Sequence, residues 1–195
     1  MRIIAGKFRS RTLEAPAGLA TRPTSDRLRE TLFNVLAPRI EGAVFLDLYA
    51  GSGAVGLEAL SRGAASVEFV ERAETAVRVL RGNLAKLGIA EGVRVHTGGV
   101  GGWLRRFATG TSAVRKPGFD LVFLDPPYEA AEEYAATLGL LGGGTAGLLA
   151  AGALVIAEHR RKERLGEGYG GLGRTRLLEQ GDAALSFYAV GPIAN

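Results

Sequence analysis

The stretch VFLDLYAGSGAVGLEALSRGA, from Val44 to Ala64, decides the fold of this chain. It opens with an apolar run, Val44 to Leu48, which predicts a buried strand that carries one acid, Asp47. A glycine-rich turn follows, and the apolar residues after it recur at helical spacing. Glycines suit such a turn because the backbone must adopt positive φ and a ligand must approach it closely. The stretch therefore predicts a strand, a tight loop and a helix whose first amides face a ligand.

The glycine spacing narrows the choice of ligand. Gly51-x-Gly53-x-x-Gly56 matches the dinucleotide fingerprint, and Glu71 ends the next apolar run. By itself the motif fits a nicotinamide or flavin site, an S-adenosylmethionine site or a structural turn. Two acids favour S-adenosylmethionine. Asp47 would repel a pyrophosphate but helps to hold a cationic methionine end, and Glu71 can accept two ribose hydroxyls.

A second motif, Asp125-Pro126-Pro127-Tyr128, follows the apolar run from Phe119 to Leu124. That run predicts a central strand, and ligands of open α/β sheets bind at the carboxyl ends of such strands. The Asp125 carboxylate and the Pro126 carbonyl can each accept one N–H of an exocyclic base amine. The prolines hold both acceptors in place, and Tyr128 can stack on the base. The plain alternative is a rigid turn that ends a strand.

Positive charge is concentrated at the beginning of the chain. The formal net charge is +4, yet residues 1–39 hold eight basic residues against three acidic ones. The rest of the chain has sixteen basic and seventeen acidic residues. A basic cluster of this kind is typical of phosphate-backbone binding. The candidate RNA-binding residues are Arg2, Lys7, Arg9, Arg11, Arg22 and Arg27.

Composition excludes several classes of protein. The chain has no cysteine, which rules out disulfides and a cysteine nucleophile of the kind that attacks C5 of cytosine. Its two histidines are too few for a familiar zinc site, so we expect no metal. We find no apolar run of transmembrane length and no signal peptide. These features predict a cytoplasmic protein that does not bind membranes. We also expect a monomer.

Elsewhere the chain alternates strands and helices, which predicts an α/β fold: a mostly parallel sheet with helices on both faces. We expect a basic β-hairpin arm in residues 1–22 and one domain in residues 23–195. A helix capped by Thr24 or Ser25 should end before Pro38. Arg27 and Arg29 lie in its first turns, where cations are unfavourable, and this suggests an anionic partner. The seven strands expected in the domain cover residues 44–48, 66–71, 93–96, 119–124, 153–159, 174–178 and 184–190. The last of them is antiparallel, and Gly166 to Gly173 is expected to be a loop.

Taken together, these motifs resemble known enzymes. DLYAGSGAVGLEALSRGA with LDPPY is similar to class I methyltransferases that act on amino groups of bases. RIIAGKFRSR and RPTSDRLRETLFNVLAP resemble the RsmD family, bacterial methyltransferases of a guanine N2 in small-subunit (16S) ribosomal RNA. The resemblance covers residues 2–190. It implies a Rossmann-like seven-stranded domain with S-adenosylmethionine as donor, and S-adenosylhomocysteine as product.

The resemblance also implies a site. The catalytic residues would be Asp125, Pro126, Pro127 and Tyr128. The cofactor-binding residues would be Asp47, Tyr49, Ala50, Gly51, Ser52, Gly53, Glu71, Arg72, Gly99 and Val100. Many relatives place an Asp or Asn near the adenine amine, whereas this chain reads Thr97-Gly98-Gly99-Val100. The substrate would be ribosomal RNA within an assembling or assembled small subunit.

Two other functions stay open on the sequence alone. A DNA or RNA adenine-N6 or cytosine-N4 methyltransferase would use the same acceptors at residues 125–128, although we recognise no target-recognition domain. A nicotinamide-dependent oxidoreductase or a non-catalytic nucleotide-binding module would leave that motif and the basic arm without a role.

Overall fold

The structure, a computed structural model, describes residues 1–16, 24–108, 118–127, 131–143 and 147–191. The chain forms two compact units, Met1–Gly98 and Gly99–Asn195, which are described separately below. Within the described residues no helix is both long enough and apolar enough to cross a bilayer.

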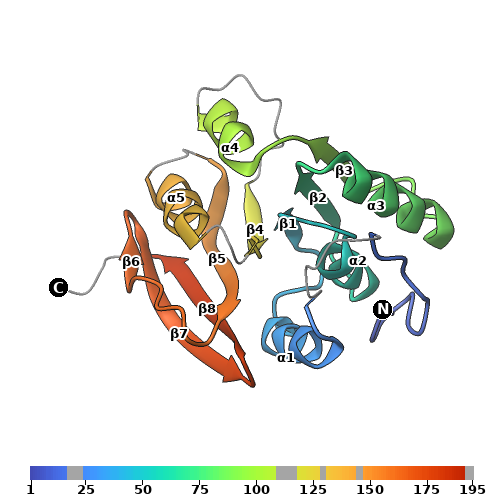
Figure 1. Cartoon of the computed structure of the whole chain (residues 1–195), viewed down its shortest axis with the longest axis horizontal. Helices are drawn as coiled ribbons and strands as arrows, with labels where there is room; N and C mark the ends of the chain where they lie inside the picture. Colours follow the sequence, from blue (N-terminus) through green and yellow to red (C-terminus); the bar gives the residue numbers. More distant parts are fainter. Residues whose placement is uncertain (17–23, 109–117, 128–130, 144–146, 192–195) are drawn as a thin grey trace. The chain divides into compact units, whose positions relative to one another are not determined.

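Three parallel strands form the sheet of the first unit, in the order β3-β2-β1 (Figure 1). These strands are β1 (Val44–Leu48), β2 (Ser66–Glu71) and β3 (Val93–Thr97). The helices of this unit are α1 (Asp26–Leu36), α2 (Ala54–Ser61) and α3 (Glu74–Leu87). Helix α2 packs on β1 and β2, and α3 packs on β2 and β3. The alternation predicted from the sequence is confirmed in this half of the chain.

Local chemistry explains where these helices begin and end. The Ser25 hydroxyl accepts a hydrogen bond from Leu28 N at 3.1 Å, which satisfies one free amide of the first turn of α1. Leu28, Leu32 and Leu36 of α1 are all buried. Helix α3 ends at Gly88, whose φ of +70° lets the backbone reverse without steric cost. The predicted cap and the predicted apolar stripe of α1 are therefore confirmed.

The N-terminal segment, residues 1–16, differs from the predicted hairpin. In place of two strands it forms one isolated antiparallel bridge, between Arg2 and Thr12. Ile3 N and Leu13 N still donate across the segment to Arg11 O and Met1 O, but Ile4 N and Ala5 N donate instead to the Glu58 carboxylate of α2. Because these amides bond to a side chain, they are not available for a regular strand ladder. Ile3 and Leu13, both buried, anchor the two ends of this turn.

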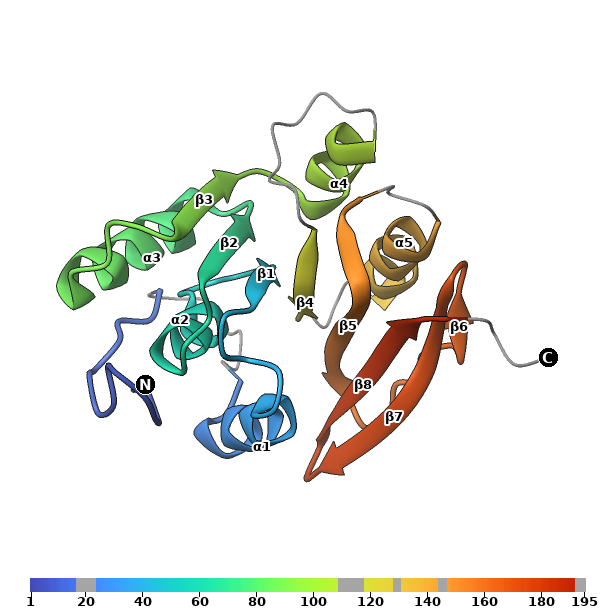
Figure 2. The ribbon, with the colours of Figure 1, turned by 180° about the vertical axis from the view of Figure 1, so that it is seen from behind.

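The second unit contains five strands in the order β4-β5-β8-β7-β6 among its described residues (Figure 2). Strands β4 (Phe119–Leu124) and β5 (Leu149–Arg160) are parallel. The strands β6 (Gly168–Tyr169), β7 (Leu172–Gln180) and β8 (Ala183–Val190) continue the sheet with antiparallel pairs. The predicted antiparallel last strand is thus confirmed.

Two details of this unit differ from the sequence prediction or refine it. The described residues form eight strands where we expected seven, because Gly168–Tyr169 pairs with Leu172 and Gly173 inside the predicted glycine-rich loop. Helices α4 (Val100–Ala108) and α5 (Ala131–Gly142) of this unit pack together. Trp103 of α4 is 3% exposed, and its ring lies near those of Phe107 and Phe119. Trp103 is therefore a core residue, as its spacing from Phe107 indicates.

Candidate functional site

The loop between β1 and α2, Tyr49–Gly53, is here named the cofactor loop. Tyr49, Gly51 and Gly53 all have positive φ, at 62°, 54° and 80°. A Cβ on Gly53 would lie 2.2 Å from Leu80 Cδ1, whereas a Cβ on Gly51 would meet nothing within 4 Å. Gly53 is thus required by packing inside the protein. Gly51 instead leaves bare backbone facing open space, where a ligand can approach it.

Glu71, at the carboxyl end of β2, holds this loop. Its Oε2 accepts a hydrogen bond from Gly51 N and its Oε1 accepts one from Ala73 N, each at 2.8 Å. The Glu71 carbonyl accepts from Gly98 N at 2.9 Å, which brings the end of β3 to the same edge. A carboxylate has about four lone-pair sites, so two can still accept hydroxyl donors such as those of a ribose. The donor set and the open backbone at Gly51 therefore fit a nucleoside ligand.

Asp47 binds the first turn of α2, directly after the cofactor loop. It is 2% exposed, and its Oδ2 accepts a hydrogen bond from Gly56 N at 2.9 Å. Gly53, the N-cap of α2, has no side chain that could accept this bond, so Asp47 replaces the missing cap from the preceding strand. Burial raises the pKa of the Asp47 carboxyl to about 8, and the nearby Glu71 charge adds to the rise. The contact of Asp47 with a cofactor stays a prediction.

The buried Asp47 leads to a testable dependence of stability on pH. The raised pKa means that the folded protein holds a proton on Asp47 that the unfolded chain releases above about pH 4. Stability contributed by the neutral acid is therefore lost as pH rises from about 4 to about 8. We expect Asp47→Asn to match the parent near pH 4 and to exceed it progressively towards pH 8. Urea unfolding of both proteins at pH 4.5, 6 and 8 measures this difference, and a constant difference would contradict it.

The Asp125 motif lies in the second unit, directly after β4. Asp125 and Pro127 are half-buried and Pro126 is buried. Tyr128, the fourth predicted member, falls outside the described residues. Register places Leu124 of β4 beside Ala157 of β5, so the next residue of β5, Glu158, lies at the same edge as Asp125. Glu158 is 2% exposed.

The remaining predicted cofactor residues lie in both units. Ala50 N donates to Val70 O at 3.1 Å, which ties the cofactor loop to β2, and Arg72 is exposed after Glu71. Gly99 and Val100 begin the second unit. The Gly99 carbonyl accepts from Trp103 N at 3.0 Å, and Val100 is buried as the first residue of α4. Their contact with an adenine stays a prediction.

The basic residues predicted to bind RNA are mostly on the surface. Lys7, Arg9, Arg11 and Arg27 are exposed. Arg2 is also exposed, with its guanidinium 3.8 Å from Asp26, while Arg22 falls outside the described residues.

The structure corrects the prediction that Arg29 faces an external anionic partner. This side chain is completely buried, donates to Asp26 at 2.9 Å and lies 3.8 Å from Glu58. Its unfavourable place in the first turn of α1 is therefore explained by anions inside the protein. No external anionic partner is needed for it.

Sequence reasoning missed two buried polar residues, Glu58 and Asn83. Glu58 is a lone acid among the apolar residues of α2, and Asn83 interrupts the apolar stripe of α3 between Leu80 and Leu87. Both are at most 1% exposed, and both make hydrogen bonds to the N-terminal segment. A polar residue on an otherwise apolar helix face was the available signal.

Comparisons with known proteins find relatives that are named as methyltransferases. Residues 1–189 match the family model described as "Conserved hypothetical protein 95". A putative rRNA methyltransferase of Bacillus subtilis, YlbH, is 36% identical over 188 residues, which cover 96% of this chain and 98% of that protein. The ribosomal RNA small subunit methyltransferase D of Escherichia coli is 44% identical over 128 residues, covering 66% of this chain and 60% of that protein. A solved structure, a putative methyltransferase of Escherichia coli, yhhF, superposes with a TM-score of 0.81 at 36% identity and covers 97% of both chains.

Proposed function

The chain belongs to the family described as Conserved hypothetical protein 95, and from this premise we propose that it methylates the exocyclic N2 amine of a guanine in small-subunit ribosomal RNA. Its fold is that of the class I methyltransferases. The observation that carries the proposal is a glycine loop open to a ligand at Gly51, in a chain where Asp125-Pro126-Pro127 follows the buried strand β4.

The methyl donor is S-adenosylmethionine, which supplies a methyl group carried on a positively charged sulfur. The open backbone at Gly51 receives the methionine end, and free lone pairs of Glu71 accept the ribose hydroxyls. Glu71 also fixes the Gly51 amide, so one side chain both shapes the loop and binds the ligand. This arrangement makes the loop rigid before binding, which lowers the cost of ordering it.

The Asp125 motif provides the chemistry on the substrate side. A base amine is a poor nucleophile because its lone pair is delocalised into the ring. The Asp125 carboxylate and the Pro126 carbonyl each accept one N–H, which turns the lone pair out of the ring and stabilises the positive charge that grows on nitrogen. Both prolines lack an N–H, so no backbone donor competes for these acceptors. Positioning should supply more of the acceleration than either hydrogen bond, because alignment of two reactants is worth about 7–11 kcal/mol.

RNA is recognised through phosphate charge and shape. The N-terminal segment presents Lys7, Arg9 and Arg11 to solvent, and each can neutralise a phosphate. A base that is already unpaired costs least to bring into a site, so a loop or bulge of the small-subunit RNA is the favoured target. The protein acts as a monomer in the cytoplasm, on RNA within an assembling or assembled small subunit.

The exposed basic residues of the N-terminal segment lead to a prediction about the salt dependence of RNA binding. The triple variant Lys7→Gln/Arg9→Gln/Arg11→Gln should weaken RNA binding and flatten the plot of log affinity against log salt. Each phosphate contact on single-stranded RNA contributes about 0.7 to that slope, so three lost contacts should reduce it by about 2. Fluorescence anisotropy with a labelled 16S RNA fragment at four salt concentrations measures the slope.

A matched triple variant controls for the loss of charge alone. Arg78→Gln/Arg81→Gln/Arg105→Gln removes the same charge from exposed positions of α3 and α4. The slope of this control should change less than that of the first triple. Equal changes in both would show that the N-terminal segment has no special role.

Calorimetric titration tests the class of cofactor. We expect heat of binding with S-adenosylmethionine and S-adenosylhomocysteine and none with NAD. Gly51→Asn places a side chain in the open space above the loop and should abolish binding while the protein stays folded, since asparagine tolerates the positive φ at this position and nothing lies within 4 Å of the Cβ. Binding of NAD alone would reverse the assignment and favour the oxidoreductase.

A further inference from the structure

A buried asparagine of α3, Asn83, connects the N-terminal segment to the cofactor loop. Asn83 Oδ1 accepts a hydrogen bond from Glu14 N at 2.8 Å, and its Nδ2 donates to Glu14 O at 3.1 Å. The same Nδ2 donates to Ser52 O at 3.0 Å. Asn83 is 1% exposed, so these bonds do not compete with water. One amide group thus fixes the backbone of Glu14 and of Ser52 together.

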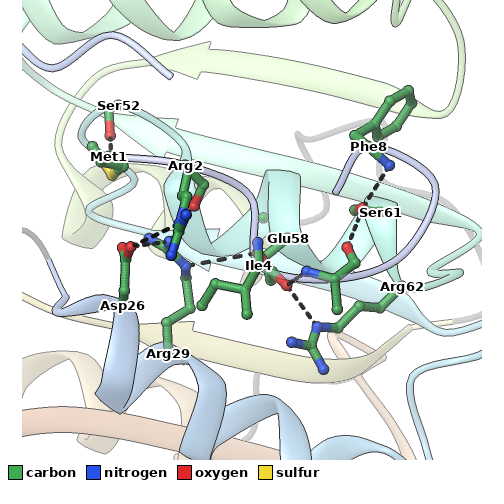
Figure 3. A network of polar contacts seen from close by, with 12 residues as sticks. Met1, Arg2, Ile4, Phe8, Asp26, Arg29, Ser52, Glu58, Ser61 and Arg62 are labelled. Carbon is green, nitrogen blue, oxygen red and sulfur yellow. Dashed lines mark hydrogen bonds and ion pairs between the residues drawn. The ribbon is translucent and has the colours of Figure 1, made fainter. Parts of the chain in front are cut away.

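A second contact joins the same two parts of the chain. Met1 Sδ lies 3.9 Å from Ser52 Oγ, the hydroxyl of the residue that Asn83 holds by its carbonyl (Figure 3). The Ser52 side chain therefore contacts Met1, the first residue of the N-terminal segment, and the Ser52 carbonyl is bound by Asn83. Its neighbour Gly51 is held by Glu71. The docked N-terminal segment thus adds its contacts at Ser52 to the bond that Glu71 makes with Gly51.

The segment is docked closely on the far end of α2 as well. Lys7 N donates to Ser61 O at 2.7 Å. Phe8 N donates to Ser61 Oγ at 2.9 Å (Figure 3). A Cβ on Gly6 would lie 1.8 Å from Ser61 O, so the turn that carries Lys7 lies directly against the helix. The N-terminal segment therefore contacts the chain at the last residue of α2, Ser61, and before its first residue, at Ser52.

We propose that Asn83 is a positioning residue which couples RNA binding at the N-terminal segment to the affinity of the cofactor loop for the methyl donor. RNA that binds Lys7, Arg9 and Arg11 favours the docked form of the N-terminal segment. The docked segment then holds Ser52 in the conformation that receives the ligand. By thermodynamic linkage the donor must then tighten RNA binding by the same factor. This inference rests on the proposed function, because it requires that RNA bind the segment.

The coupling is measured on the full-length wild-type protein. Its affinity for S-adenosylhomocysteine is titrated with and without a saturating unmodified 16S RNA fragment. We expect RNA to tighten binding by roughly fivefold or more, a usual size for coupling between two sites. If RNA binds but the affinity ratio stays at one, the coupling is wrong and the proposed function survives. If RNA does not bind at all, both fail.

Variants then test the role of Asn83 itself. In Asn83→Ala the affinity ratio should fall to about one, and in the control Asn34→Ala, an exposed asparagine of α1, it should keep its wild-type value. A merely structural asparagine would lower both affinities and leave their ratio unchanged, so an unchanged ratio in Asn83→Ala overturns the assignment.

A measurement on the wild type covers the case in which Asn83→Ala does not fold. Hydrogen exchange of the Ser52 and Gly53 amides should slow when RNA is added, while the Gly88 amide, at the C-cap of α3, should keep its rate. Unchanged exchange at Ser52 and Gly53 with RNA bound would contradict the proposal.

Discussion

Asp125→Ala is expected to lower the turnover number by about 100- to 1,000-fold, the loss seen when one preorganised charge-stabilising group is removed from an active site. The carboxylate after β4 is the only negatively charged member of the predicted catalytic motif, and it would face the positive charge that develops on the amine. A neutral methyl group at this position can neither accept the N–H nor stabilise that charge. Single-turnover assays with the enzyme in saturating excess over the RNA measure the effect on the chemical step.

Two further variants separate charge from general damage. Asp125→Asn keeps an acceptor oxygen but loses the charge, so its activity should lie between those of the parent and of Asp125→Ala. Asp182→Asn neutralises an exposed carboxylate of the β7–β8 turn and should be as active as the parent. The affinity of Asp125→Ala for S-adenosylhomocysteine should be unchanged. Full activity of Asp125→Ala would remove the motif from the mechanism.

Glu58→Gln is expected to lower the free energy of unfolding by about 3–5 kcal/mol, the usual cost of breaking a buried ion pair by removing one partner. Glu58 and Arg29 are both completely buried. The change would leave the Arg29 guanidinium with only Asp26 as a charged partner and would place an amide donor against Ile4 N, Ala5 N and Arg62 Nε. A typical domain is stable by only about 5–15 kcal/mol, so this loss is a large fraction of the total.

A double variant tests whether the buried charge is the cause. Arg29→Met/Glu58→Gln removes the uncompensated cation and should be more stable than Glu58→Gln alone. The control Glu30→Gln changes an exposed acid of α1 and should shift stability by less than about 0.5 kcal/mol. Urea unfolding followed by circular dichroism measures all three. A loss below about 1 kcal/mol in Glu58→Gln would show that the ion pair is not important for stability.

Much of the fold could be predicted because its signals are local. The apolar runs gave β1, β2 and β4 with correct boundaries, and the spacing of Val77, Leu80, Leu84 and Leu87 predicted α3 correctly. The glycine spacing predicted the cofactor loop. It did not predict which glycine serves packing and which faces open space, since that depends on the position of Leu80 on a different element.

The parts that could not be predicted depend on contacts between distant residues. The N-terminal hairpin reads as two strands, yet Glu58, more than fifty positions away, takes the amides of Ile4 and Ala5. Arg29 appears in the sequence as a surface cation, and only the buried acid beside it explains its position. Asp47 and Glu71 were predicted as ligand-binding acids, and in the structure both bond first to backbone amides of the loop region. Such long-range polar pairs have no periodicity that a sequence pattern could reveal.

The most direct test of the account is the identity of the methylated nucleoside. The purified protein is incubated with methyl-labelled S-adenosylmethionine and unmodified 16S ribosomal RNA, both naked and as assembled small subunits, and the RNA is digested to nucleosides. The account predicts label in N2-methylguanosine, and none of it when Asp125→Ala replaces the parent protein. Label in N6-methyladenosine or N4-methylcytidine, or no label in either form of the RNA, would contradict it.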